Sequence, residues 1–108
     1  MLRLGQLRQL LVHEVPVESR EADGGVVTEW KAEGPVWGQV EPLSGRKLEL
    51  AQRQEPRATH RVTLRYHPTL QARDRLVLHD DRALYVHSVI NVDENQDETV
   101  VLAEEVAT

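Results

Sequence analysis

Apolar and polar residues alternate with a period of two over much of the chain. The clearest run covers residues 59–67, THRVTLRYH, in which His60, Val62 and Leu64 fall on one face and basic residues on the other. Successive side chains of an extended strand point to opposite faces of the sheet. This run therefore predicts a half-buried strand with a basic outer face.

Turn signals divide the rest of the chain into similar runs. The expected strands cover residues 9–17, 26–32, 36–41, 59–66, 75–79, 82–90 and 99–106. The sequences DGG at 23–25 and DD at 80–81 are typical of hairpin turns, and GP at 34–35 is expected to end one strand before the next begins. Parallel strands need crossover helices, and the chain has room for only one. The predicted fold class is mainly β: a small antiparallel β-barrel or sandwich of six to seven strands, with one short helix in a long inter-strand excursion, in a single domain over residues 1–108.

The excursion covers residues 43–57, LSGRKLELAQRQEPR. Leu43, Ser44 and Leu48 have the spacing of a hydrophobic staple, with the Ser44 hydroxyl as the N-cap that accepts a hydrogen bond from an orphan amide. Proline disfavours the helical conformation in the residue before it, so Pro56 limits the helix to about residues 45–54. A short helix is thus predicted between two strands.

The charges and apolar residues of this helix are unusual for its position. Arg46 and Lys47 lie in the first turn, where basic charge opposes the helix dipole at a cost of a few tenths to about 1 kcal/mol. Leu50 is rotated by roughly 200° from Leu48, so it is expected to face away from the domain if Leu48 faces it. These residues suit contacts with a neighbouring molecule, although a solvated helix face and a lone exposed Leu are equally ordinary alternatives.

Composition limits what the core and the chemistry can be. The chain has 108 residues, 40% of them hydrophobic, with no Phe and no Cys. We therefore expect a core of Leu and Val with Trp30 and Trp37 as large anchors, and neither disulfides nor thiolate metal sites. No apolar run is long enough for a spanning helix, and the N-terminus has no signal-peptide pattern, so a cytoplasmic chain without membrane contact is expected.

Charge is unevenly distributed along the chain. Thirteen Lys and Arg residues stand against 18 Asp and Glu residues, a net charge of −5, which argues against tight binding of nucleic acid. The candidate partner or subunit interface residues are Arg46, Lys47, Leu50, Arg53 and Arg57, and the candidate acidic complement is Asp93, Glu94, Asp97 and Glu98. Complementary patches on identical subunits favour head-to-tail contacts that can close into a ring.

The sequence contains no pattern typical of a catalytic or metal-binding site. The five histidines do not have the short spacings of zinc ligands, and His79 beside Asp80 and Asp81 is typical of a turn. The serines lie in no nucleophile-elbow context, and no glycine-rich phosphate loop is present. We expect no enzyme activity, no cofactor and no metal.

The order of these signals resembles a known family. The segments LGQLRQLLVHEV, DGGVVTEW, VWGQVEPLSGRKL, THRVTLRYHP and the closing LVLHDDRALYVHSVINVDENQDETVVLAEEV are similar to those of the phage head-tail joining family, also called head closure, stopper or connector proteins. The most specific parts are residues 37–45, WGQVEPLSG, and the THR that begins the following strand. Lys47 departs from the family, since many relatives carry Glu there.

The resemblance implies a structural virion protein of a tailed phage, prophage or related particle. Such a protein is expected to form a dodecameric ring between a portal or adaptor ring above and tail proteins below, to be monomeric when isolated, and to help close the DNA channel after packaging. DNA is expected to pass without specific binding, and residues 43–57 to gate the channel or contact neighbours. The implied location is the head-tail interface of the virion, reached from the host cytoplasm.

Two other classes of function remain open from the residues alone. One is a small β-barrel module that binds protein or nucleic acid. The other is a small enzyme that uses the histidines. Neither is favoured by a specific motif in the sequence.

Overall fold

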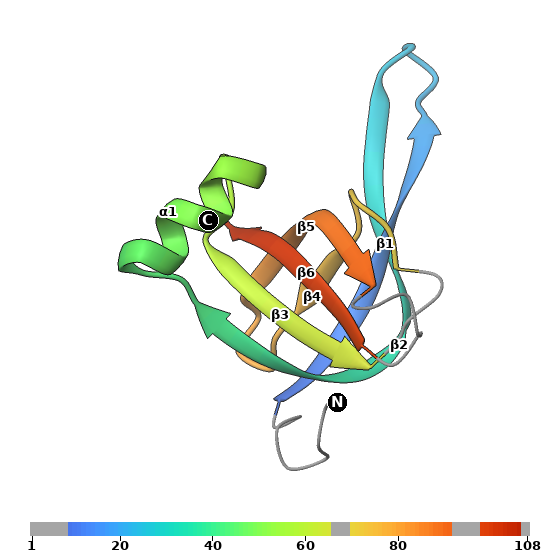
Figure 1. The fold of residues 1–108 in the computed structure, drawn as a ribbon. Helices are drawn as coiled ribbons and strands as arrows, with labels where there is room; N and C mark the ends of the chain where they lie inside the picture. Colours follow the sequence, from blue (N-terminus) through green and yellow to red (C-terminus); the bar gives the residue numbers. More distant parts are fainter. Residues whose placement is uncertain (1–8, 66–69, 92–97, 107–108) are drawn as a thin grey trace.

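The chain folds into a closed antiparallel β-barrel with one helix on its outside (Figure 1). The computed structural model describes residues 9–65, 70–91 and 98–106. Their elements are β1 (Gln9–Arg20), β2 (Val26–Pro42), α1 (Gly45–Gln54), β3 (His60–Arg65), β4 (Arg75–Val77), β5 (Ala83–Asn91) and β6 (Glu98–Glu105). The strand order is β1-β2-β3-β6-β5-β4, with β4 pairing back to β1. The predicted mainly β class, with antiparallel pairing and one short helix between strands, is confirmed.

Leucine and valine side chains fill the barrel, as the composition predicts. The buried core consists of Leu11, Val62, Leu64, Leu70, Leu76, Leu78, Leu84, Val86, Val101 and Ala103. The inner face expected for β3 is correct, because His60, Val62 and Leu64 are buried while Arg61 and Arg65 are exposed. The alternation of β3 was therefore a reliable guide to its orientation.

Trp37 is not a core anchor, and that prediction is wrong. Its side chain is 55% exposed. On β2 the neighbours Val36 and Gly38 point inward, so strand alternation puts Trp37 on the outer surface. Gly38 lies so close to Leu64 that a Cβ atom there would collide with it, and the same atom would lie only 3.3 Å from Leu11. The inner surface of β2 is thus filled by its partners' leucines and not by an aromatic ring.

The expected strand break at residues 34–35 does not occur. β2 is one strand of 17 residues that continues through Gly34 and Pro35. A register shift opposite His13 and Glu14 absorbs the irregularity, and Gly34 takes a φ of +139°, which favours glycine. Pro35 lies outside the part of β2 that pairs with β3, so its missing N–H removes no hydrogen bond to that strand.

Beyond this bulge, β1 and β2 leave the barrel as a two-stranded ribbon, here called the arm (residues 15–33). β1 pairs with β4 only at residues 12–14, and β2 pairs with β3 only at residues 38–42. Among the described residues, the two strands of the arm therefore pair only with each other, and their outer edges have no strand partner. The arm projects well away from the barrel in Figure 1, and the molecule measures 49 × 29 × 28 Å.

Both predicted hairpin turns are confirmed. At the tip of the arm, Glu21 N donates to Gly25 O (2.8 Å), and Gly24 has a φ of +90°. Between β4 and β5, Leu78 N donates to Arg82 O (2.8 Å), and Asp81 has a φ of +66°. Glycine and aspartate tolerate these left-handed positions better than most residues, which explains their presence in the turns.

Candidate assembly surfaces

Helix α1 follows the predicted bounds but is attached to the barrel only lightly. Gly45 takes a φ of +56° as the chain turns from β2 into the helix, and none of the ten helical residues is buried. The ends of the excursion are fixed by backbone bonds from Leu43 N to Thr59 O (3.0 Å) and from Thr59 N to Ala103 O (2.9 Å). The base of the excursion is thus held firmly, whereas the helix itself remains largely at the surface.

The predicted N-cap hydrogen bond is absent. Ser44 occupies the N-cap position, yet its side chain makes no capping hydrogen bond. Leu43 and Leu48, the two staple residues, are both half-buried. The sequence therefore located the start of the helix correctly, while the role assigned to the Ser44 hydroxyl was wrong.

The basic residues of the excursion are exposed and only partly paired. Lys47 Nζ lies 3.5 Å from Glu41 Oε2, and Arg53 Nη2 lies 2.9 Å from Glu49 Oε1. Arg46 and Arg57 form no ion pair with any residue in the described part of the chain. Exposed pairs of this kind contribute at most about 1 kcal/mol. The positive charge of the helix is thus available to a neighbouring molecule.

A groove separates α1 from the outer surface of the barrel. It has a volume of about 170 Å³ and is lined by Leu43, Lys47, Leu50, Ala51, Gln54, Arg61 and Leu102. Leu102 is only 4% exposed although it points out of the barrel core, since the helix side of the groove covers it. Leu50 is 46% exposed and lines this groove. The expectation that Leu50 faces away from the domain is therefore wrong.

Most of the expected acidic complement cannot be placed. Asp93, Glu94 and Asp97 lie outside the described residues. Glu98 begins β6 and stands opposite Arg65 of β3 in the sheet register. Whether these carboxylates form a patch for the basic helix stays a prediction.

The base of the arm is fixed to the barrel by an aromatic cluster around Trp30, which is half-buried and lies outside the barrel core, so its expected role as a core anchor is wrong and the cluster itself was not predicted. Trp30 packs edge-on against Tyr85, with ring centroids 5.9 Å apart, and the Arg75 guanidinium lies 4.3 Å above the Trp30 ring. Glu14 in turn accepts a hydrogen bond from Arg75. Cation–π and edge-to-face contacts each contribute about 0.5–1.5 kcal/mol. The three elements meet only in the folded barrel, so no local pattern indicates the cluster.

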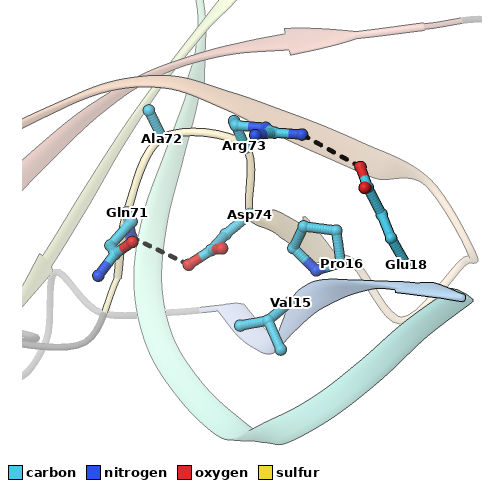
Figure 2. A pocket seen from close by; sticks show the side chains of 7 residues that line it. All are labelled: Val15, Pro16, Glu18, Gln71, Ala72, Arg73 and Asp74. Atoms are coloured by element: carbon cyan, nitrogen blue, oxygen red, sulfur yellow. Dashed lines mark hydrogen bonds and ion pairs between the residues drawn. The ribbon is translucent and has the colours of Figure 1, made fainter. Parts of the chain in front are cut away.

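A cleft of about 390 Å³ lies beside this cluster, between the arm and the loop before β4 (Figure 2). Arg73 spans it with an ion pair to Glu18, at 3.4 Å. Asp74 accepts a hydrogen bond from Gln71 N (2.9 Å) and pairs with the buried His13 ring (2.8 Å). The polar groups of the cleft are thus engaged in holding the loop against β1.

Other histidines also have structural partners. His87 Nε2 lies 2.9 Å from Glu104 Oε1, and His60 Nδ1 lies 2.9 Å from the Thr59 hydroxyl. Burial lowers the pKa of His60, against the opposing effect of Glu105. Hydrogen bonds from Arg82 lower the pKa of Glu105. Within the described ranges, no three His, Cys, Asp or Glu side chains are placed to hold a metal ion, and no helix is long and apolar enough to cross a membrane.

Solved structures share the fold. Protein SF1141 from Shigella flexneri 2a, known from a solution structure, aligns over 98% of both chains with a TM-score of 0.74 and 18% identity. A chain from the virion of a native gene transfer agent particle aligns over 94% of this chain and 97% of its own, with a TM-score of 0.61 and 24% identity. No curated protein matches the sequence significantly.

The family comparison covers almost the whole molecule. The sequence matches the family described as phage head completion protein over residues 2–106, a range that includes the arm, the helix and every strand of the barrel. The resemblance inferred from the order of sequence motifs is thereby confirmed. The chain belongs to the phage head completion protein family.

Proposed function

We propose that this structural phage protein joins the portal-bearing head to the tail and helps to close the DNA channel after packaging. The observation that carries the proposal is the family match over residues 2–106. The protein would bind a portal or adaptor ring above and tail proteins below, at the head-tail interface of the virion, after synthesis in the host cytoplasm. No catalytic step is part of this function.

The exposed elements support a role in assembly. The arm has open edges, and no residue of α1 is buried. Neither element adds to the barrel core, so both are free to contact other subunits. We infer a monomer in isolation and a ring of twelve copies in the particle, because one small barrel offers little contact area to hold a ring together unaided.

The charge of the chain suits a passage for DNA. A net charge of −5 per copy, repeated around a ring, would repel phosphates and let the genome pass without specific binding. The segment at residues 43–57 is fixed mainly at its base, as the bonds of Leu43 and Thr59 show. We infer that it contributes to the closure of the channel or to contacts around the ring.

A charge reversal on α1 tests this function. Arg46→Glu combined with Lys47→Glu should leave the monomer folded, since both side chains are exposed, but should reduce the number of particles that retain DNA. Arg46→Lys combined with Lys47→Arg is the matched control, because it keeps both charges. The readouts are circular dichroism for folding, packaged DNA per particle, and electron microscopy of the protein mixed with its portal. Normal particle assembly by the Glu variant would refute the assigned role of α1.

A second candidate function has one observation in its favour. Residues 45–65 carry six basic and two acidic residues, which is also the character of a module that binds nucleic acid or an acidic protein. Tight, steeply salt-dependent binding of duplex DNA by the purified protein would favour that module. If the purified protein does not shift DNA in a gel at low salt, a nucleic-acid-binding module is excluded.

A further inference from the structure

The arm and the excursion carry opposite charge at opposite ends of one strand. The arm (residues 15–33) contains five acidic and two basic residues, whereas the excursion (residues 43–57) contains four basic and two acidic residues and is followed in β3 by Arg61 and Arg65. Among the described residues, Glu18 is the only one of the five arm carboxylates that forms an ion pair, with Arg73. The charge of the arm is therefore largely uncompensated by the described residues of the single chain.

These two surfaces cannot neutralise each other within one copy. β2 runs for 17 residues from the tip of the arm to the residue before the excursion, and Figure 1 shows the arm and α1 on different sides of the barrel. At roughly 3.3 Å per strand residue, the separation is several times the Debye length of roughly 8 Å. Any attraction between the surfaces must act between molecules.

Their apolar parts are complementary as well. Strand alternation and register put Val17, Val27, Glu29 and Lys31 on the same face of the arm, with the further carboxylates Glu21 and Asp23 in the turn at its tip, and Val17 is 44% exposed. The groove beside α1 offers Leu50 and Leu102 at its base and Lys47 and Arg61 at its rim. Its volume of about 170 Å³ suits single side chains that project from a flat ribbon. Apolar contact and charge pairing would thus form together.

We propose that the arm of one copy docks in the α1 groove of a second copy, with Val17 and Val27 against Leu50 and Leu102 and with Glu29 near Lys47. This inference rests on the proposed function, since it names the contact that joins neighbours in the ring. Each copy presents one arm and one groove, so the contact is heterologous and continues from copy to copy until the ring closes. In this contact the arm supplies the carboxylates that face the basic helix. The contact does not depend on the acidic residues 93–98, which the sequence suggested for the same role.

Disulfide trapping tests the contact directly, because the chain has no cysteine of its own. Ser19→Cys lies on the docking face of the arm, and Gln54→Cys lines the groove. Thr28→Cys is the matched control, since it is on the opposite face of the arm. The two purified variants of each pair are mixed at millimolar concentration in low salt with oxidised glutathione. The Ser19→Cys pair should yield mixed disulfide at least about fivefold faster than the Thr28→Cys pair, and high salt should reduce the difference.

A charge exchange identifies the partner residues. Glu29→Lys in the arm variant should lower the yield of mixed disulfide by about threefold or more, and Lys47→Glu in the groove variant should restore it. Equal rates for Ser19→Cys and Thr28→Cys, a product dominated by disulfides between two copies of the Ser19→Cys variant, or no cross-linking would each overturn the inference. If particles assembled from copies that carry both Ser19→Cys and Gln54→Cys contain the ring but do not form this disulfide under oxidation, the docking mode is overturned and the proposed function is left intact. Absence of the protein from particles would refute the proposed function. The disulfide cross-linking of the purified variants would still show whether the arm of one copy binds the groove of another.

Discussion

Gly38 is a position where the barrel wall has no room for a methyl group. A Cβ atom on Gly38 would collide with the Leu64 side chain and would lie 3.3 Å from both Leu11 Cδ1 and the Thr63 carbonyl oxygen. Leu64 is 1% exposed, so it cannot turn aside without disturbing the core. The carbonyl oxygen belongs to the backbone of β3, which pairs with β2 at this point. We therefore expect Gly38→Ala to strain the contact between the two strands.

Two opposing contributions set the change in the free energy of unfolding for Gly38→Ala. Overpacking a filled core costs about 1–3 kcal/mol, and the lower entropy of the unfolded Ala variant offsets about 0.4–1 kcal/mol. The net loss in the free energy of unfolding is about 1–2 kcal/mol. For a domain of this size, that corresponds to a fall in Tm of about 4–16 °C.

Thermal and urea unfolding, followed by circular dichroism, measure this loss. Gln39→Ala is the matched control, because Gln39 is the next residue of β2 and is exposed. Its Tm should stay within a few degrees of the wild-type value. An unchanged or raised Tm for Gly38→Ala would refute the reasoning, since it would show that Leu64 and β3 can give way freely.

Further substitutions test the corrected assignments. Ser44→Ala should change the free energy of unfolding by less than about 0.5 kcal/mol in urea titrations, below the usual loss of about 1 kcal/mol, because the hydroxyl makes no capping bond. Trp37→Ala should keep the native circular dichroism spectrum and lose less than the roughly 3–5 kcal/mol typical of a buried aromatic residue, because its ring is 55% exposed. Burial lowers the pKa of His60, so the unfolded state binds a proton at this residue more readily than the folded state does. The free energy of unfolding should therefore fall as the pH drops below about 6.5. The urea midpoint of His60→Gln should fall less over the same pH range, and an equal fall in the two proteins would contradict the assignment.

Local patterns predicted the elements of this fold well. The alternation in β3, the turn residues of the two hairpins and the limits of α1 are all encoded by neighbouring residues, whose conformational preferences act within a few positions. The continuation of β2 through Gly34 and Pro35 was missed because it depends on pairing with β1, where a bulge accommodates the irregularity. A proline and a glycine alone cannot indicate whether such a partner exists.

The candidate site was predicted only in part, for a similar reason. The charges at Arg46 and Lys47 are exposed as expected, but the groove that contains Leu50 forms only when α1 lies over Leu102 of β6. The Trp30 cluster likewise joins residues far apart in the chain. Surfaces formed by residues far apart in the chain produce no periodic pattern in the sequence. Sequence patterns therefore predicted the exposed charges of α1 but not the groove beside them.

The open edges of the arm also bear on how a free copy stays soluble before assembly. Unpaired strand edges are templates for pairing with another chain, and such edges promote aggregation unless charge protects them. The arm carries Glu18, Arg20, Glu29 and Lys31 along its two strands and has an acidic excess overall. We therefore expect two free arms to repel each other and not to extend into a common sheet. The acidic residues proposed to face a neighbour in a ring would, in a concentrated pool of free subunits, delay fibre formation.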